Sequence, residues 1–131
     1  MKKAHRALRP GGILLDIHPE PDHSGVEVQV NGRRIQVGQL DESAFIEDVH
    51  AARRVLVSIV DAGHFAPEEE RVFEFLYHFD GVDALGTFLT EDWRHAEIAP
   101  AVLSRARGLL AEGEGEVLIR EPVRAARLSR L

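Results

Sequence analysis

The sequence predicts an α/β domain with a mixed sheet of about five strands and three to four helices. Three observations lead to this expectation: a nearly continuous apolar run at 13–18, an Asn-Gly hairpin pattern at 26–37, and a helical apolar stripe between 41 and 62. Strand-like and helix-like patterns then follow each other through the rest of the 131 residues. A chain of this length predicts a single domain, residues 1–131.

The first elements are a helix and a buried strand. Residues 2–9 have a basic C-terminal end, which is typical of a helix, and Pro10-Gly11-Gly12 stops it. The run at 13–18 predicts a strand buried on both faces, because it is apolar throughout rather than alternating. Pro19 and Pro21 end that strand.

A hairpin follows. Residues 26–30 and 33–37 alternate between apolar and polar on either side of Asn31-Gly32, the dipeptide most favoured in a type I′ turn. A two-residue loop predicts Val28 opposite Ile35 and Val26 opposite Val37. The other face is expected in solvent and carries Glu27, Gln29, Arg34 and Gln36.

The remaining pattern alternates helices and strands. Asp41 as N-cap and Gly63 as the left-handed end predict a helix over 41–62. Aromatic residues at spacing two favour a strand at 71–79, although Pro67 and the glutamates after it would also open a helix. Helices are expected at about 80–93 and 99–112, and a closing strand at 115–120 followed by a basic tail, 123–131, that extends it.

Composition excludes several classes of function. The chain has no cysteine, so disulfides, zinc–thiolate sites and cysteine nucleophiles are excluded. A net charge of −6 argues against nucleic acid as a partner. No apolar run approaches the ~18 residues of a membrane span, so we expect no membrane partner and a cytoplasmic location.

Three segments resemble the C-terminal half of class I S-adenosylmethionine-dependent methyltransferases, which have a Rossmann-like sheet. They are AHRALRPGGILLDIHP at 4–19, FEFLYHFDGVDALGTFLTEDW at 73–93 and EVLIREPV at 116–123. The resemblance implies a helix, Pro-Gly-Gly and the fifth strand of that sheet, then a further strand with a capped helix, then the last strand. The fold is therefore expected to be a partial methyltransferase sheet.

The cofactor-binding half of that family has no counterpart in the sequence. The Gly-x-Gly of Gly113 and Gly115 follows a helix and precedes a strand, which is the reverse of the context that a cofactor loop requires. The resemblance therefore implies no cofactor-binding residues in the isolated chain, with S-adenosylmethionine bound only if the missing half is supplied. A truncated reading frame and a genuine half-domain both fit the start at Met1.

A sheet without its proximal strands exposes an unpaired edge, which must be covered or paired. We therefore expect a homodimer or a complementary methyltransferase half as partner. The leading functional hypothesis is a methyltransferase-like fragment that is inactive alone or is completed by another chain. The alternative is a small homodimeric binding module, without catalysis, whose interface is the hairpin at 26–37 and the aromatic strand. Neither hypothesis identifies a methyl acceptor or a pathway.

Two groups of residues are candidate site residues. His18, at the carboxyl end of its strand, would act as a general base with Asp16 or Asp22, or would be an ordinary loop histidine. Tyr77, His78 and Trp93 would line an acceptor pocket, although core packing explains Tyr77 and Trp93 equally simply. His18, Asp22 and His23 lack the spacing of a metal motif, so no metal site is predicted.

Overall fold

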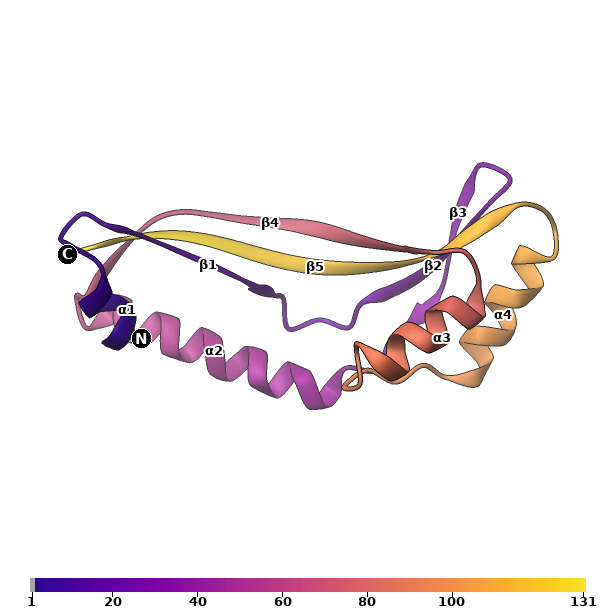
Figure 1. The fold of residues 1–131 in the computed structure, drawn as a ribbon, viewed down its shortest axis with the longest axis horizontal. Coiled ribbons are helices and arrows are strands. Elements are labelled where there is room, and N and C mark those ends of the chain that lie inside the picture. The colour runs from indigo at the N-terminus through magenta and orange to yellow at the C-terminus, as the bar shows by residue number, and fades with distance from the viewer. Residues whose placement is uncertain (1) are drawn as a thin grey trace. The chain divides into compact units, whose positions relative to one another are not determined.

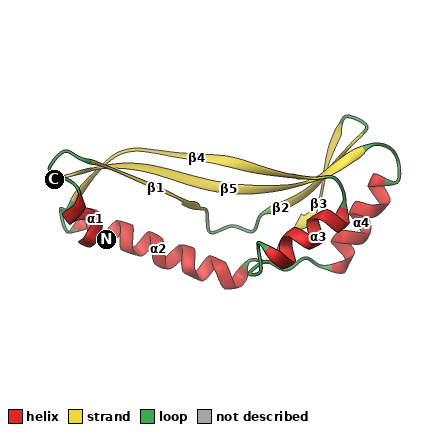
Figure 2. Cartoon of the chain, in the orientation of Figure 1, coloured by secondary structure: helices red, strands yellow, loops and turns green. Residues whose placement is uncertain are grey.

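The computed structural model describes residues 2–131, which form five strands and four helices (Figures 1 and 2). The strands are joined in the order β1-β5-β2-β3, and β4 also pairs with β5. The α/β class is confirmed. The prediction of a mixed sheet is wrong, because the sheet is antiparallel: β5 runs opposite to both β1 and β2, and β2 runs opposite to β3.

The contacts divide the chain into two compact units. Unit 1 contains the chain up to Pro21, Glu47–Phe73 and Pro122–Leu131. Unit 2 contains Asp22–Ile46 and Glu74–Glu121. The expectation of one domain stays a prediction.

Unit 1 is a sheet with a helix on one face. Its strands are β1 (Ile13–Pro19), the end of β5 (Gly115–Arg130) and the start of β4 (Phe65–Phe79), and its helices are α1 (Lys2–Ala7) and most of α2 (Ser43–Asp61). The even-numbered side chains of β1 and β5 face α2. Ile59, Phe65, Ala126 and Leu128 are buried there, with Leu8, Leu14, Leu56 and Val60 packed around them. The burial of these side chains holds α2 on the strands.

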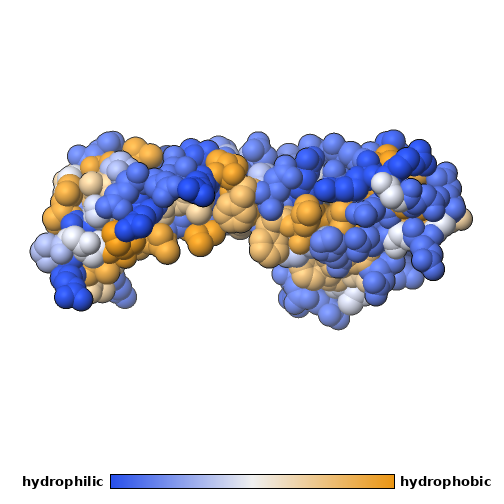
Figure 3. Space-filling model, turned by 90° about the horizontal axis from the view of Figure 1, so that it is seen from above, coloured by the Kyte–Doolittle hydropathy of each residue, from blue (hydrophilic) through white to orange (hydrophobic). Residues whose placement is uncertain are grey.

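The odd-numbered face of β1 has no such cover within the described residues. Ile13, Leu15 and Ile17 are 37%, 65% and 64% exposed. We call these three side chains the open face of β1. Figure 3 looks down on the strands from above and shows hydrophobic side chains exposed among the hydrophilic ones. The prediction of a strand buried on both faces is therefore wrong, because α2 covers only one side.

Unit 2 encloses the larger core. Its elements are β2 (Gly25–Val30), β3 (Arg33–Gln39), α3 (Val82–Glu91) and α4 (Pro100–Leu110), with the start of β5 and the end of β4. Val26, Val28 and Val30 are completely buried. Leu40, Leu85, Leu89, Trp93, Ala106, Val117 and Ile119 belong to the same core. Helices and hairpin therefore bury their apolar sides against each other.

The hairpin turn has the expected backbone, with φ of 51° at Asn31 and 75° at Gly32. Val28 lies opposite Ile35, as predicted. The predicted Val26–Val37 pair is wrong, because a bulge between Val26 and Glu27 shifts the register and places Val26 opposite Gly38. Glu27 is also buried, contrary to expectation, and its carboxylate accepts a 2.5 Å hydrogen bond from Arg34.

The other predicted elements are confirmed near their expected positions. The aromatic run is a strand, and it extends back to Phe65, through Pro67. The basic tail continues β5 as far as Arg130. Among residues 2–131 no helix has the length and apolar character needed to cross a bilayer.

Candidate functional site

The outer edge of β1 carries unpaired backbone groups. Within the described residues β1 pairs only with β5. The Glu20 N–H donates to the Pro122 carbonyl, and the Arg130 N–H donates to the Gly12 carbonyl. In an antiparallel ladder, hydrogen-bonded pairs alternate with pairs that are not bonded. The even residues of β1 therefore bond to β5, and the peptide groups of Ile13, Leu15 and Ile17 point away from it.

The same three residues thus supply both the exposed aliphatic side chains and the unpaired peptide groups. Pro19 has no N–H and bounds the edge at one end. At the other end, the Gly11 N–H is already bonded to the Arg130 carbonyl. An exposed apolar edge of this kind is a site for adding a strand from another chain.

Asp16 and His18 lie on the covered face of β1. The structure brings these two predicted site residues together, because His18 Nδ1 is hydrogen-bonded to Asp16 Oδ2. His18 Nε2 is buried and has no hydrogen-bond partner among the described residues. The His18 side chain is only 12% exposed. The pair has the arrangement of a general base with an orienting carboxylate, but its free nitrogen is shielded from solvent.

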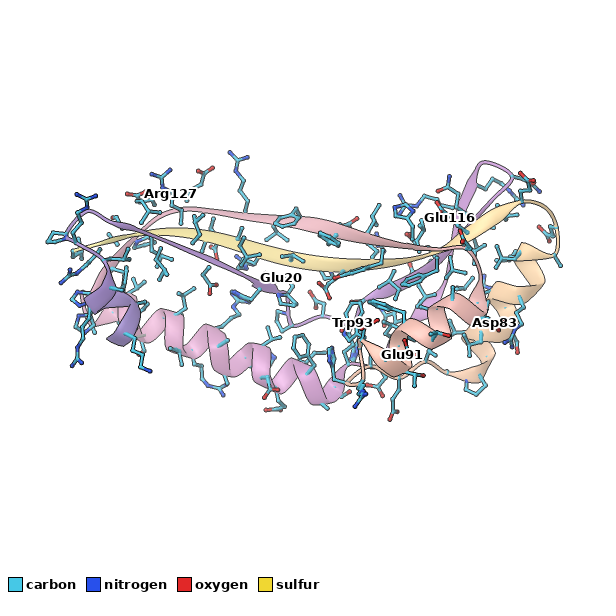
Figure 4. The ribbon with its side chains drawn as sticks, viewed as in Figure 1. Glu20, Asp83, Glu91, Trp93, Glu116 and Arg127 are labelled. Atoms are coloured by element: carbon cyan, nitrogen blue, oxygen red, sulfur yellow. The ribbon has the colours of Figure 1, made fainter. Side chains whose placement is uncertain are left out.

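Glu20 and Arg124 form an ion-pair network beside this dyad. Arg124 Nε donates to Glu20, and Arg124 Nη1 lies 2.8 Å from Glu70 Oε1. Arg53 of α2 adds a third contact, 3.9 Å from Glu20. The hydrogen bond from Arg124 is the main reason that the pKa of Glu20 is lowered. Glu20 lies on the α2 side of the strands and Arg127 on the opposite side (Figure 4).

The predicted acceptor-pocket residues separate into two environments in unit 2. The rings of Tyr77 and Trp93 lie 5.2 Å apart, and Phe88 lies 5.8 Å from each. Trp93 is buried in the core. His78 is exposed and its Nδ1 lies 3.0 Å from Glu116 Oε1. The structure thus brings Tyr77 and Trp93 together and leaves His78 out, while the acceptor pocket itself stays a prediction.

Besides Glu27, two further buried glutamates of unit 2 were not anticipated. Glu42 is 2% exposed, and its Oε1 accepts a 2.7 Å hydrogen bond from the Ser24 N–H. His95 Nε2 lies 3.8 Å from Glu42 Oε2, and Trp93 Nε1 donates to the same His95 nitrogen. The N–H of Glu42 donates to His23 Nδ1 at 3.0 Å. Ser24, His23 and His95 therefore all contact Glu42.

Glu121 is the second buried glutamate. Burial, reinforced by the negative charge of Glu42, raises the pKa of Glu121 to about 7. A hydrogen bond with Tyr77 acts in the opposite direction. Burial also raises the pKa of the Tyr77 hydroxyl. Two carboxyl groups and a phenol thus share one weakly solvated region, in which Glu121 titrates near neutral pH.

One of these two glutamates had a signal in the sequence. Val117, Ile119 and Glu121 occupy alternate positions of one strand, so the period of two places Glu121 on the buried side. Glu42 follows Asp41 directly before a helix, and nothing in that pattern indicates burial. Asp41 instead accepts a hydrogen bond from the Ser43 N–H, at 3.1 Å.

In the part of the chain that the structure describes, no group of three or more metal-ligating side chains converges. Comparisons with protein-family models, with curated proteins and with solved structures find no match for this chain.

Proposed function

We propose that the chain is a methyltransferase-like half-domain that has no S-adenosylmethionine site of its own and whose sheet is completed at β1 by another chain. The observation that carries the proposal is the outer edge of β1, where Ile13, Leu15 and Ile17 combine exposed aliphatic side chains with unpaired peptide groups. An edge that combines exposed apolar side chains with unpaired peptide groups is a template for a strand from another chain.

The resemblance described above supports the methyltransferase part of the proposal. The strands that contain the three similar segments, β1, β4 and β5, are neighbours, with β5 between the other two. Within unit 1 the ion pairs Glu70–Arg124 and Glu68–Arg127 join β4 and β5 in antiparallel order. Two strands that are far apart in the sequence are thus paired within unit 1.

The burial of His18 supports a non-catalytic role for the Asp16–His18 dyad. The Asp16–His18 dyad has the arrangement of an acid–base pair, but its Nε2 is buried. A general base must reach the proton that it removes. Within this proposal, the dyad therefore does not act on a substrate.

Calorimetric titration of S-adenosylmethionine into the purified chain tests the proposal. The expected result is no saturable heat at micromolar to millimolar cofactor, with an intact methyltransferase of known affinity as positive control. Saturable one-site binding of the cofactor by the chain would overturn the proposal.

A small homodimeric binding module is the second candidate. Its interface would not be the apolar side of the hairpin, because Val26, Val28 and Val30 are fully buried inside unit 2. The outer edge of β1 is a better interface for this candidate, because two copies of that strand can pair with each other.

A further inference from the structure

We infer that the chain which pairs with β1 is a second copy, joined in antiparallel register with Leu15 on a two-fold axis. This inference rests on the proposed role of β1 as the edge that another chain completes. It adds the identity of the occupant, its direction and its register.

The register follows from which peptide groups are unpaired. Two β1 strands can bond through their outer edges only by placing odd residues opposite odd residues. With Leu15 opposite Leu15 of the second copy, Ile13 lies opposite Ile17 on both sides of the axis. Ile13, Leu15 and Ile17 of each strand then each donate and accept a backbone hydrogen bond across the interface. A register shifted by two residues pairs only two of the three.

The side chains fit the same register. Ile13, Leu15 and Ile17 project to one face, so the two copies bring six aliphatic side chains side by side. Isologous two-fold contacts require a self-complementary patch of this kind. On the covered face, Leu14 lies opposite Asp16, so the Asp16 side chains of the two copies are diagonal neighbours and are not directly opposite each other.

Charges near the edge do not oppose the contact. Arg127, the β5 neighbour of Leu15, lies 2.8 Å from Glu68, so this charge is paired within each copy. Asp16 is bonded to His18 on the opposite face. Pro19 and the bonded Gly11 N–H limit the pairing to the seven residues of β1.

Single-cysteine variants provide the test, because the chain has no cysteine. Leu15→Cys places two sulfur-bearing residues on the axis, where paired Cα atoms lie about 5.5 Å apart, within the range that a disulfide spans. Mild oxidation should therefore give a covalent dimer on non-reducing gels. Ile17→Cys is the matched control, because the two copies of this residue are four residues out of register, about 13 Å apart along the strands. It should stay uncrosslinked alone and crosslink when mixed with Ile13→Cys.

Light scattering of the cysteine-free chain gives a second readout. A dimer is expected, and Leu15→Lys should convert it to a monomer, whereas Val57→Lys, at an exposed aliphatic residue of α2, should not. Crosslinking of Ile17→Cys alone would overturn the register, and a monomer at all concentrations would overturn the inference. If either of these results occurs and the chain does not bind S-adenosylmethionine, only the inference about the second copy fails and the proposed function is kept. Binding of S-adenosylmethionine by the isolated chain would overturn the proposed function and not this inference.

Discussion

The Glu42 carboxylate accepts a 2.7 Å hydrogen bond from the Ser24 N–H, in a region where both residues are buried. Glu42→Ala removes the acceptor and leaves the Ser24 N–H unpaired, which should cost about 1–3 kcal/mol. Glu42→Gln retains a carbonyl acceptor and should cost less. Urea denaturation of the three proteins at pH 7 measures the difference. Equal losses for the two variants would show that the hydrogen bond does not matter.

Glu121 should make stability depend on pH. Its pKa is about 7 in the folded chain against an ordinary value of 4.5. Between these values the folded chain retains a proton that the unfolded chain has released. The free energy of unfolding therefore falls as pH rises through this window, by up to about 3 kcal/mol from this group.

Glu121→Gln isolates this contribution, because the amide has nearly the same shape and does not titrate. Thermal unfolding at pH 5 and pH 8 should show that the wild-type chain loses stability relative to the variant as pH rises. A difference between the two proteins that is constant across this range would contradict the assignment.

Arg124 should contribute more to folding stability than Arg127, although each pairs with a glutamate of β4. Arg124→Met leaves Glu20, whose side chain is 11% exposed, with only the more distant Arg53, and should cost about 2 kcal/mol through the lost charged hydrogen bond. Arg127→Met removes an exposed pair with Glu68 and should cost less than about 1 kcal/mol.

The Arg124 variant also has a signature in acid. Because the pKa of Glu20 is lowered in the folded chain, its ion pair stabilises the fold above the ordinary pKa of 4.5. This contribution is lost as pH falls from 4.5 through the lowered pKa. The difference in unfolding free energy between the wild-type chain and Arg124→Met should therefore be smaller at pH 3.5 than at pH 7. A gap that stays the same at both values would indicate lost packing in place of lost charge pairing.

Gly38 of β3 should tolerate no side chain while Val102 of α4 is present. A Cβ at Gly38 would lie 2.5 Å from Val102 Cγ2, so Gly38→Ala should destabilise unit 2 by about 1–3 kcal/mol. Adding Val102→Ala should recover part of that loss. Gly81→Ala, where a Cβ meets nothing within 4 Å, is the control. Failure of the second substitution to recover any stability would place the cause elsewhere.

Local patterns of the sequence predicted the elements well. The period of two at 26–37, the stripe of α2 and the alternating aromatics of β4 each depend on near neighbours, and each element formed close to its expected residues. Strand direction was predicted wrongly, because it depends on contacts between distant segments. β5 lies between β1 and β4, so two strands that run the same way never pair with each other.

In the candidate sites, too, contacts between near neighbours could be predicted and contacts between distant segments could not. Asp16 and His18 are two residues apart on one strand, so their contact follows from local geometry. Glu42 and Glu121 are 79 positions apart by residue number, and the effect of one charge on the other needed the folded core. His78 is adjacent in sequence to Tyr77, yet strand alternation directs it to the opposite side, toward Glu116.

Strand β5 also determines when the chain is able to fold during synthesis. It pairs with β1, β2 and β4, and it supplies residues to both units. While a ribosome is still translating residues 115–130, each unit lacks its middle strand, and the valines of the hairpin have no finished core to enter. Neither unit can therefore complete its sheet until this segment has been synthesised.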